Sequence, residues 1–171
     1  FGQNVFESYT NYCYESMNAV DWLSNNVVEG DTKLAVISYP GEYGQDGATG
    51  AKMAAEYLGI ELVYDGEAAA IPGADQTPVI TSLIESGANL VWATTAPSSF
   101  AEIFGGAAAQ GFMPIWGGNS PTYNYQFLAS PLAPALDAVY YYSSYVLAWN
   151  SGDTPGMKHM VAELQARIPD K

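Results

Sequence analysis

Short apolar runs recur along the chain and are separated by longer stretches of mixed polarity. Each run is nearly continuous in aliphatic and aromatic side chains instead of alternating strictly with polar ones. Strands that are buried on both faces of a parallel sheet have this pattern. The pattern predicts five strands, at residues 33–39, 60–65, 89–95, 113–118 and 136–142.

The segments between these runs have the composition and spacing of helices. In the first segment one helical face is apolar and carries Cys13, Met17, Val20 and Leu23. Gly59 and Gly87 each follow a helical segment, at the position where glycine commonly ends a helix. The predicted helices span residues 11–26, 47–59, 79–87, 98–111 and 156–168, with a shorter helical segment at 122–128.

Strands that alternate with helices predict an α/β fold with a doubly wound parallel sheet. The length of 171 residues suits one domain, and no stretch has the composition of a linker between domains. Ligands of such sheets bind beyond the carboxyl ends of the strands. The residues that follow the predicted strands are therefore the candidates for function.

Charge and composition exclude several classes of protein. The chain has 5 Lys and Arg against 18 Asp and Glu, a formal net charge of -13, which disfavours binding to nucleic acid or anionic membranes. Its one cysteine, Cys13, and one histidine, His159, leave no internal disulfide, no cysteine metal cluster and little scope for histidine catalysis. No run of about 18 apolar residues indicates a membrane span. Because it begins at Phe1 without a signal-peptide pattern, we expect a processed piece of a longer precursor.

The stretch "SYPGEYGQDGATG" at 38–50 raises the possibility of a phosphate-binding loop. Its glycine spacing fits neither G-x-G-x-x-G nor the P-loop, and Glu42 and Asp46 would repel an anion. We interpret the glycines structurally instead. Gly41 and Gly44 would allow a sharp turn, while Gly47 and Gly50, one helical turn apart, would allow close approach to the sheet.

Enzymatic alternatives find little support. A phosphoreceiver needs an Asp after the third strand, where this chain has Thr94 and Thr95. Ser98 and Ser99 lack a G-x-S-x-G context and are better interpreted as caps of the following helix. No cluster of acidic or histidine side chains has usable metal-ligand spacing, so we predict no catalytic residue and no metal site.

The predicted strand ends instead carry a polar and aromatic set without a reactive centre. This set suits hydrogen bonding and stacking with a small molecule. It comprises Tyr39 and Tyr43 after the first strand, Thr94 and Thr95 after the third, and Asn119 and Ser120 after the fourth.

Residues 33–120 resemble a known family in the order and spacing of four pieces. These are "EYGQDGA", "LGIELVYD", "PGADQTPVITSLIESGANLVWATT" and "QGFMPIWGGN". They are similar to type I periplasmic binding proteins, the substrate-binding proteins of branched-chain amino acid ABC importers. The resemblance implies two α/β lobes that close on a ligand by a hinge motion. It further implies that this chain is the second lobe only, with residues 1–32 as entry segment and first helix and 33–171 as the ligand-binding lobe.

The resemblance also assigns expected roles to single residues. Tyr43 matches the ligand-facing Tyr of the family's Y-G motif, and Thr95 matches a ligand-facing position after the third strand. Asn119 falls where members for aliphatic amino acids use a Glu to hold the ligand's ammonium group. An amide gives a neutral hydrogen bond of roughly 1 kcal/mol where a carboxylate gives about 1.5–3. Ser120 is expected to fix polar groups of the ligand beside these residues, with Ser38, Tyr39 and Thr94 at the rim.

The resemblance therefore implies a non-enzymatic solute receptor, located in the periplasm or outside the cell, with a lipid anchor as one option for the full-length precursor. It would bind a small polar or aromatic molecule, such as an amino acid, without a cofactor, and deliver it to a membrane ABC permease. Three alternatives remain: a ligand sensor of the same fold, a flavodoxin-like cofactor-binding enzyme, and a structural α/β module.

Overall fold

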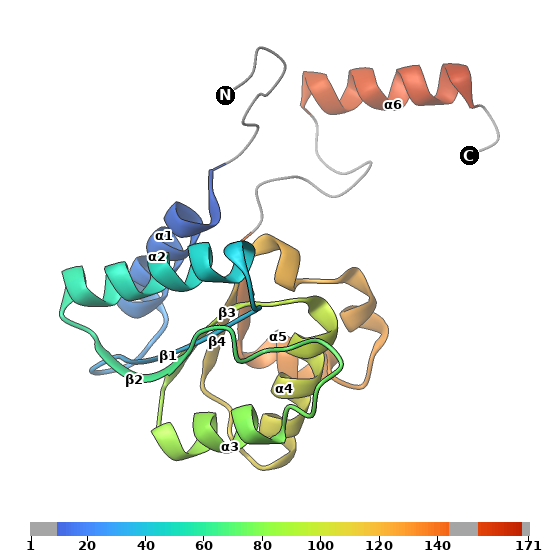
Figure 1. Ribbon diagram of the computed structural model, residues 1–171. Helices are drawn as coiled ribbons and strands as arrows, with labels where there is room; N and C mark the ends of the chain where they lie inside the picture. The colour runs from blue at the N-terminus through green and yellow to red at the C-terminus, as the bar shows by residue number, and fades with distance from the viewer. Residues whose placement is uncertain (1–9, 144–153, 169–171) are drawn as a thin grey trace.

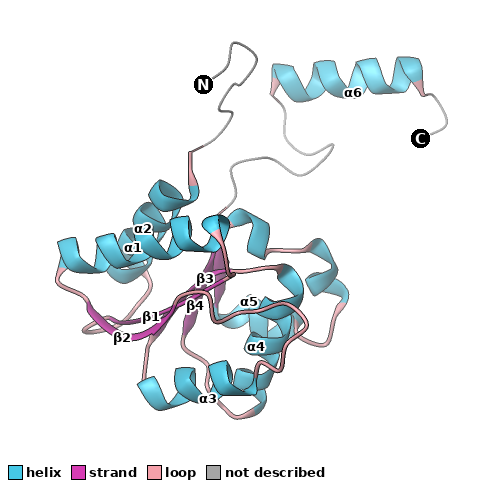
Figure 2. Cartoon of the chain, in the orientation of Figure 1, coloured by secondary structure: helices cyan, strands magenta, loops and turns pink. Residues whose placement is uncertain are grey.

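A computed structural model describes residues 10–143 and 154–168, and it contains one parallel sheet (Figure 2). The strand order is β2-β1-β3-β4-β5, and every neighbouring pair is parallel. The predicted doubly wound α/β fold is confirmed. The strands are β1 (Lys33–Ser38), β2 (Glu61–Gly66), β3 (Leu90–Thr94), β4 (Ile115–Gly118) and β5 (Tyr140–Tyr142).

Helices cover both faces of the sheet (Figure 1). On one face α1 (Tyr12–Asn26) and α2 (Glu42–Leu58) pack against side chains that include Leu34, Val36 and Trp92. Three helices lie on the other face: α3 (Thr77–Ser86), α4 (Pro97–Ala109) and α5 (Ala133–Val139). Because successive strand residues point to opposite faces, the continuous apolar runs supply both cores at once.

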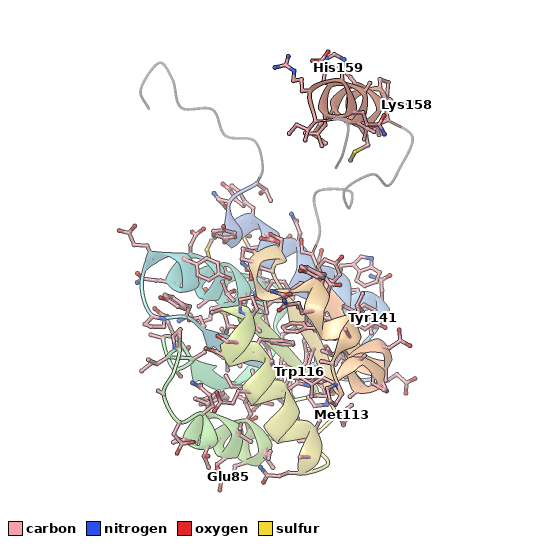
Figure 3. The ribbon with its side chains drawn as sticks, turned by 90° about the vertical axis from the view of Figure 1, so that its right-hand side faces the viewer. Glu85, Met113, Trp116, Tyr141, Lys158 and His159 are labelled. Atoms are coloured by element: carbon pink, nitrogen blue, oxygen red, sulfur yellow. The ribbon has the colours of Figure 1, made fainter. Side chains whose placement is uncertain are left out.

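The remaining elements are short or lie at the end of the chain. Two 3-10 helices, η1 (Ser120–Thr122) and η2 (Tyr125–Ala129), follow β4. The last helix, α6 (Pro155–Arg167), has no buried residue and carries Lys158 and His159 (Figure 3). Within the described ranges no helix is both long and apolar enough to cross a bilayer.

The largest differences from the predicted elements lie at the start of the second helix and in the run 136–142. The second helix begins at Glu42 instead of residue 47, because Gly41 takes the positive φ of 104° that lets the chain turn directly into it. Gly44 therefore lies inside the first turn, against the main chain of Tyr39, and is not a turn residue. The run 136–142 is also not one strand. It ends the helix α5, which has Pro134 in its first turn and a buried Leu136, before β5 begins at Tyr140.

The predicted helix ends are correct at two glycines and wrong at two serines. Gly59 and Gly87 both take the left-handed conformation directly after their helices. Ser98 and Ser99 do not cap α4, because Ala96 holds the cap position and Pro97 begins the helix. Ser99 is buried instead.

Glycines in α2 permit close contact on two sides. Gly47 packs against the Thr94 side chain of β3, which confirms the predicted approach to the sheet. Gly50 instead packs against the main chain of Cys13, so its close approach is to α1. The two glycines thus set how tightly α2 sits between the sheet and the neighbouring helix.

We predict that Gly50→Ala lowers the free energy of unfolding by about 1–3 kcal/mol, because the new Cβ would overlap the Cys13 carbonyl. In a helix with free space at this position, the same change would raise stability by roughly 0.5–1 kcal/mol. The sign of the stability change therefore reports whether α1 and α2 are in close contact here. Gly105→Ala in α4 is the control, since its nearest neighbour is the movable end of Leu132. Urea unfolding that gives the two variants equal stability would contradict this packing.

Candidate functional site

The carboxyl ends of β1, β3 and β4 meet at one edge of the sheet, beside the first turns of α1 and α2. Tyr43 lies in the first turn of α2, Thr95 directly follows β3, and Asn119 directly follows β4. The Tyr43 hydroxyl donates to Asn119 Oδ1 at 3.0 Å, and the Thr95 carbonyl oxygen is a second acceptor at 3.2 Å. Three candidates that are far apart in the sequence are therefore in direct contact.

Thr122 joins this group, although the sequence analysis did not identify it. Its hydroxyl donates to Asn119 Oδ1 at 2.6 Å and accepts the Thr95 main-chain N–H at 3.0 Å. The Thr122 N–H in turn donates to the Asn119 carbonyl at 3.0 Å. The sequence signal is a Thr three residues after Asn119, a spacing that closes a tight turn beyond the strand.

The candidates divide into a buried base and an accessible rim. Thr94, Thr95 and Asn119 are fully buried, as is Ser38, whose hydroxyl accepts the Ala68 N–H at 2.9 Å. Tyr39, Tyr43 and Ser120 are only partly buried. Ser38 and Thr94 are therefore not rim residues in this chain, because they lie under the adjoining helix and loop. The part that the structure describes supplies no partner for three buried polar atoms of the base, Thr94 Oγ1, Thr95 Oγ1 and Asn119 Nδ2.

Tyrosine rings form the accessible side of this edge. The Tyr12 ring meets Tyr43 edge-on with centroids 4.9 Å apart, and the Tyr39 ring lies tilted to Tyr43 with centroids 6.0 Å apart. A cavity of about 520 Å³ opens beside Tyr43, between the first turns of α1 and α2. Glu42 and Asp46 line it together with Tyr12, so it is acidic as well as aromatic.

Burial raises the pKa of Tyr43 to about 12. The side chains of Asn119 and Thr122 hydrogen-bond to its hydroxyl and oppose this shift, while the nearby Tyr12 and Glu15 add to it. Tyr43 therefore acts as a neutral hydrogen-bond donor throughout the physiological range.

Glu15 is a second residue that the sequence analysis missed. It lies on α1 among polar neighbours, where an amphipathic helix would expose it, yet it is buried. Its Oε1 accepts the Ser120 main-chain N–H at 2.9 Å. Burial raises the pKa of Glu15, with smaller opposing effects from the Ser120 main chain and the Ser143 side chain. Only the position of Ser120 in space, which the sequence pattern does not encode, explains this burial.

The site has groups that suit the binding of a small molecule. Across residues 10–143 and 154–168, no three His, Cys, Asp or Glu side chains are placed to hold a metal ion. The connected hydroxyl and amide groups suit the recognition of polar groups, and the tyrosine rings suit an apolar or aromatic body.

Comparison with known proteins places this geometry in context. The family model described as periplasmic binding protein matches residues 2–171. A comparison with curated proteins gives no match. Three solved structures illustrate the similarity in fold, and the chain spans about two fifths of the length of each.

The first is a fatty acid ABC transporter substrate-binding protein from Thermomonospora curvata, at 25% identity and a TM-score of 0.77, covering 94% of this chain and 41% of that one. The second is a branched chain amino acid ABC transporter from Thermus thermophilus with bound valine, at 21% identity and a TM-score of 0.71, covering 92% and 40%. The third is a solute binding protein from R. palustris in complex with 4-hydroxybenzoate, at 17% identity and a TM-score of 0.67, covering 91% and 41%.

We predict that Thr122→Val lowers the free energy of unfolding by about 1–3 kcal/mol. Valine has the same shape but leaves the buried Thr95 N–H without its acceptor and removes the donor to Asn119. Thr122→Ser keeps the hydroxyl and is the matched control, expected to lose less stability than the valine variant. Urea unfolding that ranks the two variants in the opposite order would contradict the assigned role of the hydroxyl.

Tyr43 should also make stability depend on alkaline pH. Between about pH 10 and pH 12 the unfolded chain loses the tyrosine proton while the folded chain keeps it, so folding is weakened as pH rises through this window. We expect the free energy of unfolding to fall more steeply with pH for the natural chain than for Tyr43→Phe. Parallel curves over this window, measured by urea unfolding, would show that Tyr43 titrates normally.

Proposed function

The chain belongs to the periplasmic binding protein family, and from this premise we propose that it is the ligand-binding lobe of an ABC importer's solute receptor. The family consists of binding proteins and not of enzymes, which sets aside the flavodoxin-like alternative. One observation carries the proposal. Tyr43, Thr95 and Asn119 converge at the carboxyl edge of the sheet and form a hydrogen-bonded group.

In this proposal the rim contacts the ligand and the base orients the rim. Tyr43 and Tyr39 present their rings to the body of the ligand, and Ser120 offers a hydroxyl to a polar group. Thr94, Thr95 and Asn119 lie buried beneath them, and Thr95 and Asn119 hold Tyr43 in place by accepting from its hydroxyl. The buried polar atoms of the base without partners, such as Asn119 Nδ2, are available to the ligand if closure shifts Tyr43.

The ligand class follows from the mixture of aromatic and neutral polar groups. The similar structures carry names that state a fatty acid, valine or 4-hydroxybenzoate, so the fold accommodates different small molecules with an apolar body. In this chain Asn119 offers an amide where a carboxylate would favour an ammonium group. We therefore propose a small polar or aromatic ligand whose binding does not require a carboxylate at position 119.

The complete protein would contain further parts. Residues 33–171 would be one ligand-binding lobe and residues 1–32 its entry segment and first helix. A second lobe would close over the tyrosine rim by a hinge motion. The closed protein would then deliver its ligand to an ABC permease in the membrane, from a periplasmic or extracellular location.

The test is a thermal-shift screen of the complete two-lobe protein against amino acids, amides, aromatic acids and fatty acids. We expect at least one compound to raise the melting temperature, because ligand that binds the folded state stabilises it. The 171-residue chain should bind that compound about tenfold more weakly or worse, since one wall of the site is absent. No stabilisation across the panel, or equal affinity of both proteins in calorimetry, would contradict the proposal.

Tyr43→Phe should weaken binding of the compound found in the screen by about threefold to tenfold, since one neutral hydrogen bond contributes about 1 kcal/mol. Tyr57→Phe is the matched control, because Tyr57 lies on the same helix and is 88% exposed. Calorimetry that finds the same loss for both variants would remove Tyr43 from the site.

A further inference from the structure

A second cavity lies against α1, apart from the cavity beside Tyr43. It has a volume of about 730 Å³ and lies between α1 and β5, on the sheet face that α1 and α2 cover. Trp92 and Leu23 form its floor, packed so closely over Gly117 that a side chain there would overlap both. This cavity shares no lining residue with the cavity beside Tyr43.

Glu15 supplies a carboxylate to the wall of this cavity. The residue is 3% exposed, and its Oε1 is held by the Ser120 N–H. The other oxygen, Oε2, is buried and makes no hydrogen bond of good geometry within the described ranges, and the Ser143 side chain, which also lines the cavity, is the polar group that lies near this carboxyl. A buried carboxylate oxygen is costly unless a donor, and preferably a cation, pairs with it.

Among the residues that the structure describes, no lysine or arginine is one of the groups that shift the pKa of Glu15 or one of the residues that line this cavity. Lys33 begins β1 at the opposite end of the sheet, and Lys52 bridges Asp65 and Glu67. A positively charged ligand in the cavity would supply the charge that complements an ionised Glu15.

Aromatic side chains line the outer part of the cavity. Trp22 of α1 and Tyr141 of β5 lie with ring centroids 6.2 Å apart and tilted by 55°. They are 53% and 40% exposed, so much of their surface is available to a ligand. Exposed aromatic rings beside a carboxylate attract organic cations, both by apolar contact and by cation–π attraction.

We propose that the cavity between α1 and β5 is a second ligand site, which takes a small primary amine with an aromatic or aliphatic body. The ammonium group would donate to Glu15 Oε2, and the body would lie against Trp22 and Tyr141. A carboxylate ligand would be repelled by Glu15, and a neutral alcohol would lose the charge-assisted part of the hydrogen bond. This site goes beyond the proposed transport site, and neither depends on the other.

The experiment is calorimetric titration of the 171-residue chain with 2-phenylethylamine, 2-phenylethanol and 3-phenylpropionate. These probes share an aromatic body and differ in the charge of the head group. We expect the amine to bind one-to-one and at least about tenfold more tightly than the alcohol, with no binding of the acid. Equal binding of amine and alcohol would overturn the proposal.

Variants separate this site from general attraction of cations to an acidic protein. Glu15→Gln keeps an oxygen for the Ser120 N–H and should weaken amine binding at least tenfold. Glu85→Gln removes the same charge from an exposed position on α3, well away from Tyr141 (Figure 3), and should leave binding unchanged. Equal losses in both variants would overturn the proposal.

Two further variants test whether a change in amine binding could come from misfolding or from the transport site. Trp22→Ala changes an exposed side chain, so it should fold normally and still weaken amine binding severalfold. Tyr43→Phe should leave amine binding unchanged, whether or not the transport proposal holds. Amine binding that is present in this chain but lost in the complete protein would overturn the proposal, because the cavity would then be covered by protein.

Discussion

The Thr122 hydroxyl is the contact on which the carboxyl edge of the sheet depends. It lies between Thr95, which directly follows β3, and Asn119, which directly follows β4, and it bonds to both. Asn119 in turn receives the Tyr43 hydroxyl from α2. One buried side chain therefore ties two strands and a helix together at the edge where a ligand is expected. Removing it would leave buried polar groups unpaired, and such groups cost more than the bond itself contributes.

The sequence predicted the layers of this fold because hydrophobic burial acts on short patterns. Continuous apolar runs such as Leu90–Thr94 are typical of strands that are buried on both faces of a parallel sheet. Gly59 and Gly87 end helices because glycine takes the left-handed conformation without a steric clash. Prediction failed where tertiary packing decides. Residues 136–142 have strand composition, but Leu136 is drawn into the core as part of a helix before the strand begins at Tyr140.

The candidate site was predictable in its location and not in its connections. Polar residues after consecutive parallel strands must lie at one edge, so Tyr43, Thr95 and Asn119 could be grouped from topology alone. That Asn119 is fully buried, with its oxygen shared by two hydroxyls, depends on side-chain directions that no pattern encodes. Glu15 shows most clearly what the pattern misses. It is a polar residue on an amphipathic helix, yet it is buried, and its hydrogen-bond donor is the main-chain N–H of Ser120, 105 residues away.

The first turn of α1 separates two cavities of related character. Tyr43, Glu42 and Asp46 line one, and Trp22, Tyr141 and Glu15 line the other, so both combine aromatic rings with carboxylates. The central claim concerns the first, at the carboxyl edge. Its most direct test is an amide chemical-shift titration of the chain with the ligand that most stabilises the complete protein. The account predicts the largest shifts at Tyr43, Thr95 and Ser120. Shifts concentrated at the amino ends of the strands, around Lys33 and Gly59, would contradict it.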